Sequence, residues 1–162
     1  MEKEDQKENI LEINQHKNKV HIILAHSYSV FLSLFLVGVF LDLIFNLKIL
    51  NFSFILPIGV AFIFLASLLI LWAQKTSRNL KKENLTKETF FKGPYRFTRS
   101  PTHLGLFFLT LGFGLIVNGI FIVISTIISF AITKLVYLKK EETILEKKYG
   151  APYLEYKKAV KF

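Results

Sequence analysis

The sequence predicts an all-α protein, a multi-pass transmembrane helical bundle of about four spans followed by short cytosolic C-terminal helices. Three observations lead to this fold class. First, 52% of the 162 residues are hydrophobic, which is high for a soluble domain of this size. Second, the apolar residues form stretches of the roughly 20 residues that a helix needs to cross a bilayer. Third, the cations behind the net charge of +9 lie in the segments that border those stretches.

The first half of the chain predicts a polar lead-in and a helical hairpin. Residues 1–21 carry five acids and four lysines and lack the apolar core of a signal peptide, so we expect a solvated or interfacial segment. Residues 22–73 form the expected first transmembrane hairpin, with spans at 22–45 and 52–73. Asp42 is the one acid or base of fixed charge inside these spans, and it is either a functional residue or one that reaches the interface.

The third apolar region, residues 103–133, is too long for one crossing. Its 31 residues would form a helix of about 46 Å. The Asn118-Gly119 pair near its middle is a turn signal. Eight cations lie in a cytosolic basic linker, residues 74–102, and eight more lie between residue 134 and the C-terminus. A reversal at Asn118 places both groups, and both termini, on the cytosolic side, as the positive-inside rule requires.

The second transmembrane hairpin, expected over residues 103–138, would bring two polar clusters to one membrane face. The first cluster lies at the end of the basic linker, at residues 93–105. The second lies in a cytosolic helical tail, expected over residues 139–162, and begins with Glu141 and Glu142. Arginine, histidine, paired glutamates and several tyrosines at one face are typical of a functional site.

The order of residues within the two clusters is specific. The first reads Gly-Pro-Tyr-Arg-Phe-Thr-Arg-Ser-Pro-Thr-His-Leu-Gly. The second has two glutamates, a leucine three residues on, an aromatic–glycine pair, two tyrosines three residues apart and a terminal basic residue. Together they resemble the motifs of the isoprenylcysteine carboxyl methyltransferase and phospholipid methyltransferase superfamily. The chain departs from that pattern at Ser100, where the superfamily has His, at His103, where it has Tyr, and at Lys161, where it often has Arg.

The resemblance implies an integral membrane enzyme that transfers a methyl group from S-adenosylmethionine to a lipophilic or lipid-anchored acceptor, which could be a carboxylate, an amine or a thiol. The membrane would be the inner membrane of a bacterium or the endoplasmic reticulum of a eukaryote. The residues that the resemblance assigns to cofactor binding are Tyr95, Arg99, Ser100, Pro101, His103, Gly105, Glu141, Glu142 and Tyr149.

The chemistry of Arg99 and the glutamate pair agrees with that assignment. An arginine can hold a carboxylate with two parallel hydrogen bonds, and a glutamate can accept one from an ammonium or a ribose hydroxyl. Adjacent residues point about 100° apart on a helix, so we expect Glu142 rather than Glu141 to face the pocket. A structural ion pair with Lys139 or Lys140 is the alternative for the two glutamates.

Three residues are candidates for the catalytic step, namely Glu142, His103 and Lys161. Methyl transfer from a sulfonium is an in-line displacement, in which positioning and a dry site supply much of the rate. A base is needed only for a protonated acceptor, and His103 or Lys161 could orient an anionic one. His103 lies three residues after Ser100 on the same helix face and could compensate for the missing histidine. The alternative is that His103 is an interfacial polar residue.

Other functions fit the sequence less well. It contains no cysteine, and its histidines show no metal-ligand spacing with carboxylates, so we expect no metal. No DNA-binding or RNA-binding motif is present, so we expect membrane lipids rather than nucleic acid as the partners of the basic segments. Two alternatives to a methyltransferase stay open. One is a catalytically degenerate membrane scaffold of the same fold, because of Ser100, and the other is an NADPH-dependent enzyme similar to sterol reductases.

Overall fold

The computed structural model describes residues 2–49, 54–80 and 90–160, with side chains described for residues 22–49, 54–77 and 90–160. The described part of the chain is helical apart from short connections and one isolated β-bridge, which confirms the all-α prediction. In chain order the elements are α1 (Glu2–Phe45), α2 (Ile55–Leu80), the 3-10 turn η1 (Gly93–Arg96), α4 (Pro101–Ile116), α5 (Ile120–Ile132), the π-helical turn η2 (Thr133–Tyr137), α6 (Leu138–Tyr149) and α7 (Ala151–Ala159).

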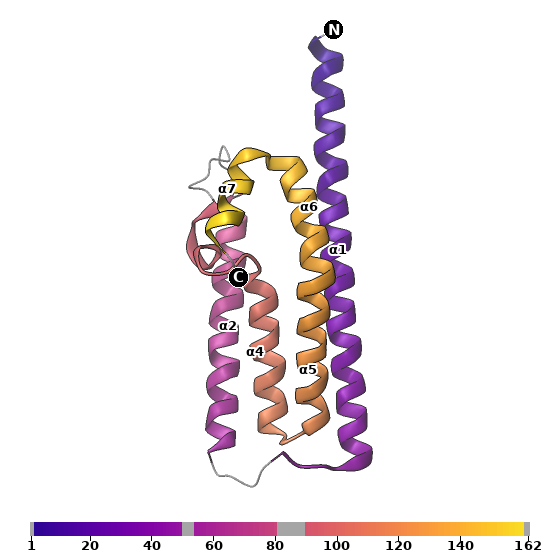
Figure 1. The fold of residues 1–162 in the computed structure, drawn as a ribbon, viewed down its shortest axis with the longest axis vertical. Coiled ribbons are helices and arrows are strands. Elements are labelled where there is room, and N and C mark those ends of the chain that lie inside the picture. Colours follow the sequence, from indigo (N-terminus) through magenta and orange to yellow (C-terminus); the bar gives the residue numbers. More distant parts are fainter. Residues whose placement is uncertain (1, 50–53, 81–89, 161–162) are drawn as a thin grey trace.

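The long helices lie side by side in the order α2, α4, α5, α1 (Figure 1). Each packs against the next, since α2 contacts α4, α4 contacts α5, and α5 contacts α1. The α5 helix continues through η2 into α6, and α7 then folds back over the same end of the bundle (Figure 1). We call this the α7 end; the N-terminal part of α1 projects beyond it.

Among the described residues, three helical segments are long and apolar enough to cross a membrane, and they are Ile22–Phe45, Ile55–Ser77 and Ile120–Tyr149. The α4 helix lies among them but has only 16 residues, which corresponds to about 24 Å against a bilayer core of about 30 Å. With α4 as a shorter span, the arrangement agrees with the prediction of about four spans.

Two helices are longer than the apolar spans predicted from the sequence. The first begins at Glu2, so the polar lead-in and the first span form one helix of 44 residues. The lead-in is rich in Glu, Lys and Gln, which favour helix, and it contains no Pro or Gly that would end one. The second helix ends at Leu80 rather than at Ala73. Hydropathy marks where a helix enters the bilayer, whereas the helix itself continues as far as its residue types allow.

The chain reverses at Asn118, where the sequence predicts a turn. Asn118 has a φ of +56°, and its Oδ1 accepts a hydrogen bond from the backbone N–H of Ile49 at 3.0 Å. At the start of α5, the Asp42 carboxylate accepts hydrogen bonds from the backbone N–H groups of Phe121 at 3.0 Å and Ile122 at 2.9 Å. Asp42 therefore caps α5 from a neighbouring helix, which explains why an acid is tolerated inside a span.

Glycines set the distance between α2 and α4. A Cβ on Gly112 would lie 2.7 Å from the carbonyl oxygen of Gly59, so the two backbones are in contact there. Nearer the α7 end, a Cβ on Gly105 would lie 2.5 Å from the side chain of Ile70. Glycine at both positions therefore allows α2 and α4 to pack closely. This packing places the beginning of α4 directly against α2.

Candidate active site

An ion pair between Arg99 and Glu142 joins the two polar clusters. Arg99 lies just before α4, whose first turn begins with the buried Pro101, and Glu142 lies on α6. Arg99 Nη1 is 2.8 Å from Glu142 Oε1, and the two side chains are 15% and 6% exposed. Opposite charges held together in a largely buried position can bind a ligand that itself carries both charges.

Glu142 is the member of the glutamate pair that faces inward, since it is buried whereas Glu141 is half-buried. Lys139 and Lys140, the alternative partners, are exposed, and neither forms an ion pair with a glutamate in the described part of the chain. The Arg99 guanidinium lies beside Glu142 Oε1, and a carboxylate oxygen can accept more than one hydrogen bond. This oxygen can therefore still accept a hydrogen bond from a ligand.

Lys157 was not among the residues predicted for the site, yet it is a second cation at Glu142. Its Nζ lies 3.0 Å from Glu142 Oε2 and also pairs with Glu146. The hydrogen bonds from Lys157 to Glu146 and Glu142 raise the pKa of the lysine above its ordinary value. The sequence carries a signal for this contact, because Glu142 and Glu146 are one helical turn apart and share a face of α6. Lys157 holds α7 against that face.

Aromatic side chains pack the linker against α7. Tyr153 and Tyr156 are buried, and the residues packed with them are Phe90, Phe91, Tyr95, Leu145, Tyr149 and Val160. The Tyr156 hydroxyl donates a hydrogen bond to the backbone carbonyl of Tyr95 at 2.8 Å. Burial raises the pKa of Tyr153 and of Tyr156, so both hydroxyls stay protonated. This aromatic cluster fixes the segment that leads to Arg99.

The two tyrosines predicted to bind the cofactor belong to this aromatic cluster. Tyr95 is half-buried in η1, and burial raises its pKa. Tyr149 ends α6, and its ring meets that of Phe90 edge-on, with 5.3 Å between the ring centroids. Lys148 Nζ lies 5.0 Å from the Tyr149 ring centroid. The structure thus places both tyrosines around the junction of the linker with α6 and α7, and contact with a cofactor stays a prediction.

His103, from the first polar cluster, is buried and packs against α1. Its Nε2 is 3.0 Å from Ser27 Oγ, and its ring centroid is 5.3 Å from that of Tyr28. The Ser27 hydroxyl donates to Thr133 Oγ1 at 3.5 Å, so it can accept from a protonated Nε2 of His103. None of these contacts involves Arg99. His103 is 3% exposed, so its surroundings are protein side chains of α1 and η2.

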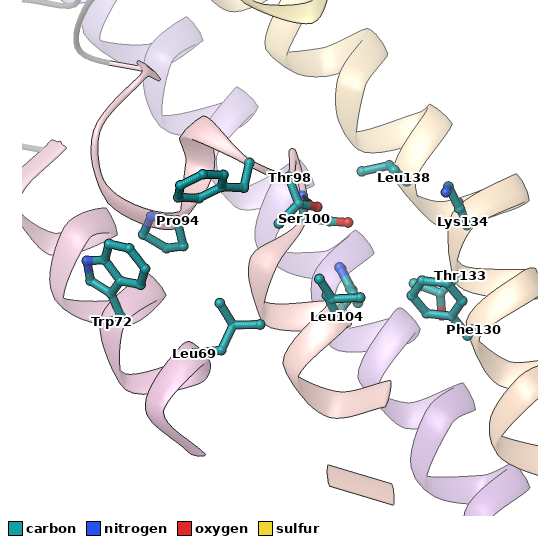
Figure 2. A pocket seen from close by; sticks show the side chains of 12 residues that line it. Leu69, Trp72, Pro94, Thr98, Ser100, Leu104, Phe130, Thr133, Lys134 and Leu138 are labelled. Atoms are coloured by element: carbon teal, nitrogen blue, oxygen red, sulfur yellow. Dashed lines mark hydrogen bonds between the residues drawn. The ribbon is translucent and has the colours of Figure 1, made fainter. Parts of the chain in front are cut away.

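A cavity of about 280 Å³ lies between α2, the start of α4 and the continuous helix α5–η2–α6. Figure 2 shows Leu69 and Trp72 on one side of it, Phe130 and Lys134 on the other, and Leu104 between them. Of the predicted site residues, the two that line this cavity are Ser100 and His103. Because Ser100 directly follows Arg99, the cavity and the ion pair are neighbours along the chain.

The remaining predicted residues have structural surroundings of their own. Ser100 precedes the first turn of α4, and its backbone N–H donates to Thr98 Oγ1 at 3.3 Å. Pro101 is buried in that turn, and Gly105 lies against Ile70 of α2. Lys161 lies outside the described residues.

Comparison with protein families decides the relationship of the chain to known proteins. A family model described as phospholipid methyltransferase matches residues 54–152, which is more than half of the sequence. The chain belongs to the phospholipid methyltransferase family. No curated protein and no solved structure gives a match.

The family model matches this family member from α2 to the start of α7. It contains both polar clusters up to Tyr149, whereas α1 and Lys157 lie outside it. Family membership and the apolar helices identify an integral membrane protein of a methyltransferase family. Within the described part of the chain, no group of three or more histidine and acidic side chains could hold a metal ion.

Proposed function

We propose that this chain transfers a methyl group from S-adenosylmethionine to a lipophilic acceptor in the membrane. The observation that carries the proposal is the ion pair of Arg99 and Glu142 in a member of the phospholipid methyltransferase family. When bound, S-adenosylmethionine supplies a methyl group on a sulfonium, and transfer of that group to a nucleophilic acceptor leaves S-adenosylhomocysteine.

The charges at the ion pair fit the amino-acid end of this cofactor, which carries a carboxylate and an ammonium. Arg99 would hold the carboxylate through charge-assisted hydrogen bonds. Glu142 Oε1 would accept a hydrogen bond from the ammonium through its second lone pair. Lys157, at the other oxygen of Glu142, would keep the glutamate in place when Arg99 turns to the ligand.

The other predicted residues would complete the site in two ways. Tyr95 and Tyr149, at the junction of the linker with α6 and α7, and Glu141 on α6 would contact the rest of the cofactor. Ser100, Pro101 and Gly105 would shape the beginning of α4, Gly105 through its close packing with α2.

Acceptor chemistry would fall to the residues on the other side of Ser100. His103 lines the cavity, and a neutral imidazole that donates from Nε2 to Ser27 keeps an unprotonated Nδ1. This nitrogen would take a proton from an acceptor that arrives protonated. Glu142 would act by positioning, and Lys161 would orient an anionic acceptor.

Ligand-induced thermal stabilisation tests the proposal against its alternatives. The protein, purified in detergent, should melt at a higher temperature with S-adenosylhomocysteine than in buffer, and NADPH should leave its melting temperature unchanged. Radiolabelled methyl groups should then pass from S-adenosylmethionine to lipids of a membrane extract. Stabilisation by NADPH alone would support a reductase, and stabilisation by neither ligand would support a scaffold; either result contradicts the proposal.

A further inference from the structure

The cavity lined by Ser100 and His103 is small and largely apolar. Its volume of about 280 Å³ is below the range of about 300–1,000 Å³ that is usual for whole small-molecule sites. It can therefore hold part of a ligand, such as a segment of hydrocarbon chain, but not a whole nucleoside cofactor. Leu69, Leu104, Phe130 and Leu138 form much of its wall.

The edge of the cavity is exposed where the lipid of a bilayer would surround the helices. Trp72 on α2 and Phe97 in the linker line the cavity and are 47% and 69% exposed. Aromatic side chains at the ends of transmembrane spans lie at the membrane–water interface, next to the hydrocarbon. A lipid chain can therefore reach the cavity from the side, without leaving the membrane.

One wall of the cavity carries a cation. Among the described residues that line it, Lys134 is the one lysine or arginine, and none is an acid. Lys134 is half-buried, and its Nζ lies 6.0 Å from the ring centroid of Phe130. The hydroxyl residues Thr98, Ser100 and Thr133 also line the cavity and can donate hydrogen bonds to an anion.

The π-helical turn η2 is responsible for the position of this cation. It comprises Thr133–Tyr137, so both Thr133 and Lys134 lie where the regular helix of α5 is interrupted. A π turn inside a long helix changes the direction of the side chains that follow and occurs frequently at functional sites. Here the residues on both sides of the interruption, Phe130 and Leu138, line the same cavity.

We infer that the cavity receives the hydrocarbon chain of a membrane lipid and that Lys134 selects lipids with an anionic group next to that chain. This inference rests on the proposed function, because Arg99 and Ser100 are consecutive and a lipid in the cavity would lie next to the cofactor. A partly buried ammonium is stabilised by an anion and repels a cation. Lys134 is thus a specificity-determining residue for the acceptor.

Trp72 makes occupation of the cavity measurable, because it is the single tryptophan of the chain and lines the cavity. Bromine on a hydrocarbon chain that enters should quench its fluorescence. The probes are a brominated fatty acid, the alcohol of equal length and the amine of equal length, each titrated over the same range of mole fractions in detergent micelles. We expect the fatty acid to reach half-maximal quenching at a concentration about tenfold below that of the alcohol, with the amine weakest.

Variants separate selection by Lys134 from general attraction to a basic protein. In Lys134→Gln the advantage of the fatty acid over the alcohol should disappear, while quenching by the alcohol stays as in the wild type. Lys139→Gln, which removes an exposed cation on α6, should keep the full advantage. Equal quenching by all three probes in the wild type, or an unchanged preference in Lys134→Gln, would overturn the inference.

The same samples distinguish this inference from the proposed function. Stabilisation by S-adenosylhomocysteine should be equal in the wild type, Lys134→Gln and Lys139→Gln, because the cofactor contacts Arg99 and Glu142. Loss of anion selectivity with intact stabilisation by S-adenosylhomocysteine supports the role of Lys134. Absence of stabilisation in the wild type contradicts the proposed function, whatever the lipid preference.

Discussion

Replacing Glu142 by Gln keeps the shape of the side chain and removes the charge that Arg99 and Lys157 share. Both cations would lose their common partner, from which they lie 2.8 Å and 3.0 Å away. Breaking a fully buried ion pair by removing one partner costs about 3–5 kcal/mol. The side chains of Arg99 and Lys157 are 15% and 35% exposed, so water would compensate in part. We expect Glu142→Gln to lower the free energy of unfolding by about 2 kcal/mol.

The matched control is Glu141→Gln, the same substitution at the half-buried neighbour. It should lower the free energy of unfolding by much less than Glu142→Gln, because no described residue forms an ion pair with Glu141. Denaturant titrations of both variants in the same detergent, followed by circular dichroism, give the comparison. Glu142→Gln should also weaken binding of S-adenosylhomocysteine by about tenfold or more, since it removes a charged acceptor. Equal losses of stability in the two variants, or undiminished binding in Glu142→Gln, would refute the reasoning.

Three further predictions test the packing around the site. Asp42→Ala removes the cap of α5 and should lower the free energy of unfolding by about 1–2 kcal/mol in the same titration; no change would show that the cap contributes nothing. Gly112→Ala forces α4 away from Gly59 and should cost about 1–3 kcal/mol, whereas an unchanged stability would contradict the close backbone contact. Because the pKa of Lys157 is raised in the folded state, its contribution is complete below the ordinary lysine pKa of 10.5 and is lost as the pH rises through the higher folded value. The difference in melting temperature between the wild type and Lys157→Met should therefore be constant up to the ordinary lysine pKa of 10.5 and shrink at higher pH. A difference that shrinks on acidification near neutrality would contradict this assignment.

The fold could be predicted because two features of the sequence determine the topology of a membrane protein. They are the lengths of its apolar stretches and the positions of its charged residues. Spans follow from the thickness of the bilayer, and the reversal at Asn118 follows from the two groups of cations that flank the third apolar region. The extents of the helices could not be predicted in this way. The apolar stretch begins at Ile22, but α1 begins at Glu2, because charged residues with high helix propensity extend the helix towards the N-terminus.

The candidate site was predictable where a motif names the residues and was missed where a contact depends on folding. The motifs single out Arg99 and Glu142, and the hairpin brings them together. Lys157 reaches Glu142 only because the chain turns back at Gly150, whose φ of +60° suits glycine. The sequence indicates that one helix ends and another begins at this glycine. It does not indicate the direction in which α7 returns.

The cap formed by Asp42 was missed for a similar reason. The sequence shows an acid near the end of a span, and a side chain that reaches water is the ordinary explanation for such a residue. Its actual partners, the backbone N–H groups that begin α5, come from a helix far along the chain. Only the packing of α1 against α5 brings donor and acceptor together.

Equilibrium binding of S-adenosylhomocysteine to the purified protein tests the role of Arg99 most directly. Arg96, three residues earlier and exposed, provides the matched control for removal of an arginine from the same segment. We predict that the wild type and Arg96→Gln bind S-adenosylhomocysteine with similar affinity, and that Arg99→Gln binds it at least about tenfold more weakly. Equal affinity in all three proteins, or no binding by the wild type, would contradict a cofactor site built on Arg99 and Glu142.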